Sequence, residues 1–447
     1  MPNDYFVKNG WLGTARGGAY YLYNTVAKEF AVFSSQASFD ARADALLAPV
    51  HTDPHPDFTA PPQFSAVTLT TKCNMECPYC YVKPVSGSGE MTADQAREAV
   101  DALAERADGE LVLYAWGGEP TQNPEALLAM VQQAQRYRSV KVLLISNGVM
   151  DSALLEKLLT FRNLVFQISF DGLISQSRQK RLIARDDSLV KMLDSMETIS
   201  RVSKRVALRA TVTRGNVSEL KNCLVPTARR FTNRIILEHL HTFNGRAVAM
   251  RHEAPDVSDY TNLIFDLVPF AEEQGIHVKA LPLDHLRSGG PNDRMNFLNV
   301  LPDGQVTVTN AIIHSSHPDF SALRIGAIKS RHLVFDPEAN TRLTQRYLYH
   351  YRQQCQTCFA RTICHGSVQR YLFLANENLT EWDDLRCRYF QAVIARWIDE
   401  SIAKVCDFLQ TLGVTEGFVR LDAPPGKIHY PMFVMKAGLS LSYRPFQ

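Results

Sequence analysis

Short apolar runs of strand length alternate with longer amphipathic stretches over residues 64–241. The short runs are rich in β-branched and aromatic residues, and the longer stretches repeat apolar residues at helical spacing. This alternation is typical of βα units arranged around a parallel sheet. It predicts six strands, at Phe64–Thr70, Leu111–Trp116, Val140–Ser146, Leu164–Phe170, Val206–Thr213 and Ile235–His241.

The helices predicted between these strands include Thr92–Ala107 and Asn123–Arg136. Thr92 and Gln95 have the spacing of a capping box, which marks the start of the first helix. No glycine-rich turn follows the first strand, so a Rossmann sheet is disfavoured. We therefore expect an α/β fold built on a partial (β/α)6 TIM-like barrel, in which loops after the carboxyl ends of the strands carry the chemistry.

The pattern changes on both sides of this barrel. The residues before it carry aromatic segments and then a run rich in proline and histidine, whereas a hairpin is predicted after it, at Phe297–Asn310 with a turn at Pro302-Asp303-Gly304. A helix at Arg388–Leu412 leads into a tail without a functional signal. We expect four regions: an N-terminal unit and linker (1–62), the barrel (63–290), a cysteine-rich region (291–395) and a C-terminal helix and tail (396–447).

Composition narrows the classes of partner. The chain has 447 residues, 45% of them hydrophobic, which is enough for a sizeable core. Its 48 basic and 46 acidic residues give a net charge of +2, so we expect neither a nucleic-acid nor a membrane partner. Because no cationic segment precedes an apolar run at the N-terminus and no apolar stretch of about eighteen residues occurs, the expected location is the cytoplasm.

Nine cysteines are present, and seven of them fall into two groups. In a reducing compartment, grouped thiols favour metal ligation over disulfides. The other two, Cys223 and Cys406, lie among apolar neighbours and are expected in the core.

The first group is Cys73, Cys77 and Cys80, directly after the first predicted strand. Three thiolates from one loop can each hold one iron of a cubane cluster, which leaves the fourth iron open to a chelating ligand. A zinc site completed by a histidine, or a set of surface thiols, is the alternative.

This loop resembles the signature of the radical S-adenosylmethionine (SAM) superfamily, C-x3-C-x2-C with an aromatic residue before the last cysteine, here Tyr79. The resemblance implies a 4Fe-4S cluster that binds SAM and cleaves it reductively. It extends to further strand ends and implies these SAM-binding residues: Gly117, Gly118, Glu119 and Pro120 (a GGEP motif for the amino group), Ser146 and Asn147 (ribose), Ser169 and Asp171 (the fourth-strand motif), and Arg181 (the carboxylate).

The chemistry of SAM agrees with these residue types. Its methionyl part presents an ammonium and a carboxylate, which one acid and one arginine orient through charge-assisted hydrogen bonds. Each motif also has a structural alternative. The GGEP motif alone could be a turn, and Arg181 lies in a basic stretch, Arg178–Arg185, that could simply be solvated.

The second group is Cys355, Cys358, Cys364 and Cys387. Four thiolates saturate a metal, so this site should be closed and should hold a cubane cluster or a zinc ion. The segment resembles the SPASM extension of radical SAM enzymes, which implies an auxiliary 4Fe-4S cluster. Two further cysteines of that extension are replaced by Asn310 and Val368, and none precedes the hairpin, so we expect one auxiliary cluster instead of two.

The resemblance implies formation of a 5′-deoxyadenosyl radical, which abstracts a hydrogen atom from a substrate carbon. The Tyr-Leu-Tyr-Asn segment near the N-terminus resembles the front segment of peptide maturases, so we expect oxidative crosslinking of a ribosomally made peptide. The expected partners are a peptide or protein substrate and an external electron donor such as flavodoxin or ferredoxin.

Other functions remain open at this stage. Sulfatase maturation is disfavoured because Ala311 stands where an acid is expected. The main alternative is a dehydrogenase or rearrangement enzyme with one auxiliary cluster, acting on a small molecule such as an aminosugar. A non-enzymatic metal-binding or electron-carrying module is the third possibility. The sequence does not point to a catalytic acid or base.

Overall fold

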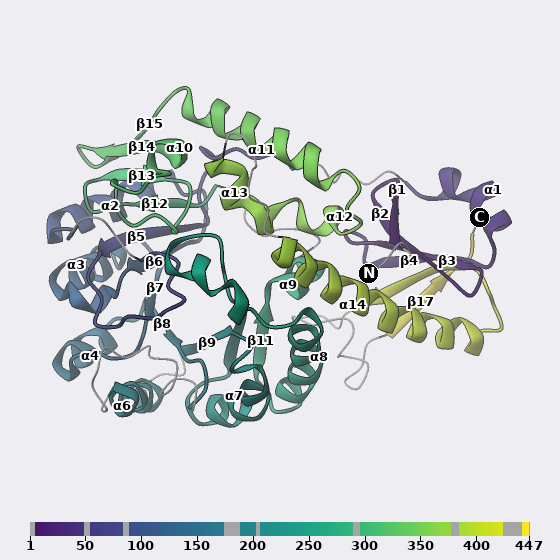
Figure 1. Ribbon diagram of the computed structural model, residues 1–447, viewed down its shortest axis with the longest axis horizontal. Helices are drawn as coiled ribbons and strands as arrows, with labels where there is room; N and C mark the ends of the chain where they lie inside the picture. The colour runs from purple at the N-terminus through teal and green to yellow at the C-terminus, as the bar shows by residue number, and fades with distance from the viewer. Residues whose placement is uncertain are drawn as a thin grey trace.

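A computed structural model describes residues 5–48, 54–83, 89–173, 188–202, 206–288, 296–376, 384–422 and 440–446. Within these residues, the seven strands β5 to β11 run parallel to their neighbours and form an open, partial barrel (Figure 1). All six predicted strands are present and the α/β class is confirmed. The strands are β5 (Phe64–Thr70), β6 (Leu111–Gly117), β7 (Val140–Ser146), β8 (Leu164–Ser169), β9 (Val206–Val212), β10 (Arg234–His239) and β11 (His277–Ala280).

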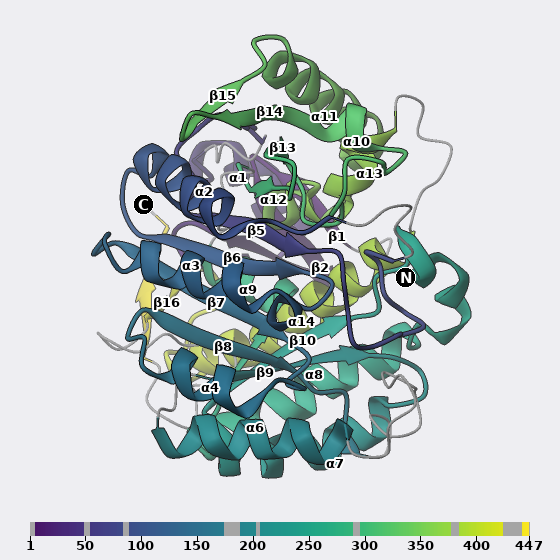
Figure 2. The same cartoon turned by 90° about the vertical axis from the view of Figure 1, so that its left-hand side faces the viewer.

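Helices follow the strands and cover one face of the sheet, as Figure 2 shows for the first of them. They are α2 (Ala93–Arg106), α3 (Pro124–Ala134), α4 (Ser152–Leu159), α6 (Ser188–Val202), α7 (Val217–Phe231) and α8 (Val257–Glu273). The predicted capping box starts α2, with both reciprocal hydrogen bonds between Thr92 and Gln95. Alternate strand residues such as Val140, Val142 and Leu144 are buried under these helices. The opposite alternation therefore faces the barrel interior.

The cysteine-rich region continues the barrel sheet. β12 (Leu298–Val300) pairs in parallel with β5, and β13 (Gln305–Thr307), β14 (Arg324–Lys329) and β15 (His332–Phe335) add antiparallel strands, so the predicted hairpin is present. The helices that follow are α10 (Phe320–Leu323), α11 (Ala339–Cys355), α12 (Arg361–Cys364), the 3₁₀ helix η3 (Ser367–Gln369), α13 (Arg370–Ala375) and α14 (Asp384–Thr411).

The two ends of the chain meet in a second, antiparallel sheet. It consists of β1 (Tyr5–Lys8), β2 (Trp11–Arg16), β3 (Ala19–Asn24), β4 (Glu29–Phe33), β16 (Gly417–Asp422) and β17 (Ser440–Arg444). Helix α1 (Gln36–Leu46) packs on this sheet, and α14 runs from the barrel to it (Figure 1). The rings of Tyr23 and Trp397 meet there with centroids 4.8 Å apart. The tail without a functional signal thus supplies two strands of this terminal sheet.

The remaining elements are short, namely the 3₁₀ helices η1 (Pro120–Gln122) and η2 (Gly245–Glu253) and the helix α9 (Leu281–Ser288). In the part of the chain that the structure describes, no helix is both long and apolar enough to cross a membrane.

Candidate functional site

The first cysteine loop leaves β5 at the carboxyl end of the barrel. Cys73, Cys77 and Cys80 all line one open cavity of about 960 Å³ including its mouth, which we call the central cavity. Burial raises the pKa of Cys73 to about 12, and the Glu119 carboxylate and the thiolates of Cys77 and Cys80 add to the effect. The loop therefore presents three thiols to one space.

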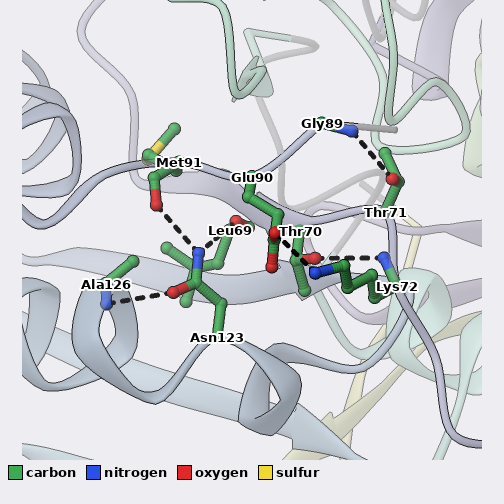
Figure 3. A network of polar contacts seen from close by, with 9 residues as sticks. All are labelled: Leu69, Thr70, Thr71, Lys72, Gly89, Glu90, Met91, Asn123 and Ala126. Atoms are coloured by element: carbon green, nitrogen blue, oxygen red, sulfur yellow. Dashed lines mark hydrogen bonds and ion pairs between the residues drawn. The ribbon is translucent and has the colours of Figure 1, made fainter. Parts of the chain in front are cut away.

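A network of polar contacts anchors the start of this loop (Figure 3). The Lys72 amide donates to Thr70 Oγ1 at 3.0 Å, and the Gly89 amide donates to Thr71 Oγ1 at 3.0 Å. The Lys72 ammonium also pairs with the Glu90 carboxylate at 2.6 Å, but both side chains are substantially exposed. The contact between Gly89 and Thr71 brings the chain after the cysteine loop back to the end of β5.

The same network ties β5 to α3 through one side chain (Figure 3). Asn123 Nδ2 donates to the carbonyls of Leu69 and Met91 at 2.9 and 2.8 Å. Its Oδ1 accepts from the Ala126 amide at 3.3 Å, so the same residue caps α3. Because both carbonyls lie beside the cysteine loop, Asn123 fixes the position from which that loop departs.

The two glycines of the GGEP motif dock directly against the loop. The Gly118 amide donates to the Thr70 carbonyl at 2.9 Å, and the Glu119 amide donates to the Lys72 carbonyl at 2.8 Å. A Cβ on Gly117, whose φ is 135°, would stand 2.1 Å from the Thr70 carbonyl oxygen, and one on Gly118 would stand 2.2 Å from that of Lys72. Only glycine permits so close a backbone approach.

Glu119 is 1% exposed and lines the central cavity. Its Oε1 accepts from Thr121 Oγ1 and Ser146 Oγ, both at 2.9 Å, and its Oε2 accepts from the Asn147 amide at 2.8 Å. Burial raises the pKa of this carboxyl, and these hydrogen bonds oppose the rise. A cationic group entering the cavity would favour the charged carboxylate. Pro120 opens η1 and does not line the cavity.

The two residues of the fourth-strand motif, Ser169 and Asp171, differ in whether they line the central cavity. Ser169 lines the central cavity, as do Ser146 and Asn147 at the end of β7. Asp171 is 1% exposed, does not line the cavity, and accepts from the Tyr79 hydroxyl and from the Thr211 amide. Asp171 therefore acts on the cavity through Tyr79, which does line it. Arg181 lies outside the described residues.

The second cysteine group gathers at the junction of several helices. Cys355 ends α11, Cys364 ends α12, and Cys387 lies in the first turn of α14, with Cys358 in the turn between α11 and α12. Burial raises the pKa of Cys387 to about 12, and the Cys364 and Cys358 thiolates contribute. Cys355 has a raised pKa from burial and from the other three thiolates. The four thiols therefore influence one another electrostatically at this junction of helices.

Val368 and Asn310 stand at the two positions where the SPASM extension would have further cysteines. Val368 is buried at 2% exposure, and the carbonyl of Asn310 accepts from the Trp116 indole at 2.8 Å. Within the described ranges, no group of three or more Cys, His, Asp and Glu side chains is arranged to hold a single metal ion.

A comparison with protein families identifies the part of the chain that carries this site. Residues 67–220, which run from β5 into α7, match the model of the Radical SAM superfamily. The chain contains a radical SAM domain. The matched region holds the cysteine loop, the GGEP motif and the ends of β7 and β8. The match of this domain to the family implies a 4Fe-4S cluster and SAM.

Two curated relatives have enzyme names, and with the family they support an enzyme. Pre-heme d1 synthase of Dinoroseobacter shibae is 26% identical over 233 residues, which cover 52% of this chain and 56% of the relative. The radical SAM cyclopropyl synthase TigE of Paramaledivibacter caminithermalis is 22% identical over 240 residues, 48% of each chain. This chain thus spans about half the length of the curated relatives it matches.

Solved structures share the fold over a larger part of the chain. Native anSMEcpe with bound AdoMet and a peptide has a TM-score of 0.59 at 15% identity, covering 78% of this chain and all of that one. Streptococcus suis SuiB bound to the precursor peptide SuiA has a TM-score of 0.51 at 12% identity, covering 86% and 99%. At these identities the likeness concerns the fold.

The radical SAM domain also brings together side chains that were not predicted as site residues. Arg209 and Thr211 of β9 and His241 after β10 line the central cavity, and Arg209 is the register partner of Ser169. Burial would raise the pKa of Glu238, but His241 (Nε2 to Oε2, 3.3 Å) and Arg209 hold it well below its ordinary value. The alternation of side chains along β9 could have identified Arg209 and Thr211 as cavity residues, since residues 209 and 211 lie on one face of the strand.

Proposed function

We propose that this chain is a radical SAM enzyme that cleaves SAM reductively and abstracts a hydrogen atom from a peptide substrate during an oxidative post-translational modification. One observation carries the proposal. Three thiols and a buried carboxylate, Glu119, converge on a single open cavity at the carboxyl end of a parallel barrel. An iron–sulfur cluster with one open iron and a ligand with an ammonium group fit this donor set.

Each residue of the proposed site has a role in binding or orientation. Cys73, Cys77 and Cys80 would hold the cluster, and Glu119 would receive the SAM amino group. Ser146 and Asn147 are proposed for the ribose, and Arg181 for the carboxylate. Ser169 and Asp171 are proposed as the fourth-strand motif for SAM binding. When bound, the cluster and SAM supply the 5′-deoxyadenosyl radical that takes the hydrogen atom. The protein then has to hold the substrate carbon nearby and exclude water.

Other side chains that line the central cavity suit substrate binding. Tyr81 and Trp116 stack with ring centroids 6.3 Å apart and form an aromatic wall of the cavity. Arg209, Thr211 and His241 form a polar wall that none of the SAM-binding roles uses. Tyr81 also meets the His241 ring edge-on at 5.9 Å between centroids, so aromatic and polar side chains adjoin in this cavity. Such a mixed lining orients a substrate and limits access of water to the radical.

The second site is proposed to hold one auxiliary 4Fe-4S cluster, with zinc as the alternative. Its donor set would be the four thiols at this junction of helices, which is enough to saturate either metal centre. Iron analysis after anaerobic reconstitution separates the two. Roughly eight irons per chain indicate two cubane clusters, and roughly four indicate zinc at the second site.

A peptide substrate is supported by two features. The structures that share this fold include SuiB bound to its precursor peptide and anSMEcpe bound to a peptide. The chain also carries the terminal sheet, at whose edge β1 pairs with β2 alone within the described residues. An external one-electron donor such as flavodoxin or ferredoxin would supply the reducing equivalent.

A small-molecule substrate is the second candidate, because the relative with 26% identity is named pre-heme d1 synthase, whose product is not a peptide. The radical SAM step is tested by 5′-deoxyadenosine release from SAM under reduction, which an electron carrier would not produce. The substrate class is tested by incubating the reduced enzyme with a short peptide encoded beside its gene. A mass change in that peptide supports peptide modification, and an unmodified peptide together with steady deoxyadenosine release favours the small molecule.

A further inference from the structure

The sulfur atoms of the second cysteine group receive hydrogen bonds from two glutamine side chains. Gln369 Nε2 donates to Cys387 Sγ at 3.2 Å, and Gln391 Nε2 donates to Cys358 Sγ at 3.3 Å. A thiolate sulfur can only accept, so the chemistry fixes which end of each amide faces it. Two of the four proposed cluster ligands thus have an amide donor of their own.

The backbone is shaped to deliver the first glutamine. After Cys364 the chain enters the left-handed region at two consecutive residues, His365 (φ 51°) and Gly366 (φ 77°). The Tyr347 hydroxyl donates to the His365 carbonyl at 2.5 Å and holds this turn in place. The turn leads into η3 and returns Gln369, which is fully buried, to the cysteine group.

The second glutamine comes from α14. Gln391 follows Cys387 by four residues, so the two side chains share one face of the helix. The donors are therefore crossed. The loop after Cys364 donates to the cysteine of α14, and α14 donates to the cysteine between α11 and α12.

These contacts have a direct electrostatic consequence for a cluster held there. One-electron reduction of a 4Fe-4S cluster from the 2+ to the 1+ state adds one negative charge, part of which resides on the ligating sulfur atoms. Hydrogen bonds to those atoms stabilise the reduced state more than the oxidised state, so they raise the reduction potential.

We infer that Gln369 and Gln391 are tuning residues that raise the reduction potential of the auxiliary cluster and make it an electron acceptor. The inference rests on the proposed function, since it requires a cluster at this site. It also sharpens that function, because a cluster poised to accept an electron suits an oxidative reaction of the substrate.

The test uses the full-length chain with Cys73, Cys77 and Cys80 all changed to Ala, so that the remaining iron reports the auxiliary site. Gln369→Met and Gln391→Met remove the donor at similar side-chain volume. Redox titration followed by electron paramagnetic resonance measures the reduction potential in each variant. We expect each substitution to shift the potential downward and the double variant to shift it further. The matched control, Gln354→Met, changes an exposed glutamine beside Cys355 and should leave the potential unchanged.

A purely structural role gives a different result. If the glutamines only hold α14 against the neighbouring segments of the second cysteine group, the variants lose iron or have a lower melting temperature. The cluster that remains then keeps its reduction potential, and the inference fails. Gln391→Glu provides a second measurement, because it keeps the side-chain length and replaces the donor with an acceptor. At alkaline pH it should lower the potential at least as far as Gln391→Met. A parent chain that binds zinc and no iron would instead overturn the proposed auxiliary cluster itself.

Discussion

The two cysteine sites of this protein are built in opposite ways. The barrel site takes three thiols from one loop, and other strand ends supply the remaining walls of its cavity. The second cysteine site takes four thiols from helix ends and a turn, and two glutamine side chains contact two of them. A site assembled from one loop can leave a coordination position open, because only one side is occupied by protein. A site enclosed by several helices is closed by its own ligands.

The largest expected effect comes from removing the open site. Changing Cys73, Cys77 and Cys80 together to Ala should abolish 5′-deoxyadenosine release and remove about half of the bound iron, because the auxiliary thiols are untouched. Chromatographic detection of deoxyadenosine and an iron assay measure both. A chain with Cys223 and Cys406 changed to Ala serves as control and should keep its iron and its activity. Undiminished SAM cleavage by the triple variant would contradict the assignment of the open site.

The next effect concerns the backbone contact that positions the loop. Gly118→Ala would place a Cβ 2.2 Å from the Lys72 carbonyl oxygen, so the loop must move. We expect a loss of about 3 kcal/mol in the free energy of unfolding and selective loss of the SAM-binding cluster. Gly109→Ala is the matched control, since a Cβ there meets no atom within 4 Å. Chemical denaturation and iron analysis measure the two quantities, and equal stability of both variants would refute the docking role.

A smaller effect is expected from the charge of the buried carboxylate. Glu119→Gln keeps the shape of the side chain but loses the charge proposed to bind the SAM ammonium. A charge-assisted hydrogen bond contributes about 2 kcal/mol, so the dissociation constant for SAM should rise about 30-fold. Isothermal titration of the reconstituted chain measures it, with the exposed Glu110→Gln as control. Unchanged SAM affinity with intact iron would exclude this role for Glu119.

The smallest expected change in the free energy of unfolding concerns the exposed ion pair of the network in Figure 3, compared with the hydrogen bonds of Asn123 in the same network. The ion pair of Lys72 and Glu90 is solvated, so Glu90→Gln should lower the free energy of unfolding by less than about 1 kcal/mol. Asn123→Ala, its comparison, removes two bonds to carbonyls and a helix cap and should cost about 2 kcal/mol. Denaturant titration of both variants decides, and a larger loss for Glu90→Gln would reverse this ranking.

Much of the barrel was predictable because its signals are local. The six predicted strands match β5–β10 to within two residues at each end, since alternation and chain length define a strand within a few residues. β11 was missed because it has only four residues. The pairing of β4 with β16 was also missed, because hydrogen bonds between the two ends of the chain leave no mark in either segment alone.

The predicted site residues also include some that the structure places at the cavity and some that it does not. Ten of the predicted residues line the central cavity: Cys73, Cys77, Tyr79, Cys80, Gly117, Gly118, Glu119, Ser146, Asn147 and Ser169. Pro120 and Asp171 lie behind this wall, and Arg181 stays a prediction. Arg209 and His241 were missed because no short motif marks them. They lie at the cavity because parallel register places β9 beside β8 and β10 beside β9.

The amino-acid sequence by itself determined the cysteine loop, the glycines that let it dock and the order of the βα units, because spacing and periodicity act over a few residues. Only the tertiary structure decided which side chains oppose the loop, how the chain ends share a sheet, and which glutamines reach the auxiliary thiols. Those arrangements depend on contacts between residues far apart in the chain, whose partners are chosen by packing and hydrogen bonding of the whole fold.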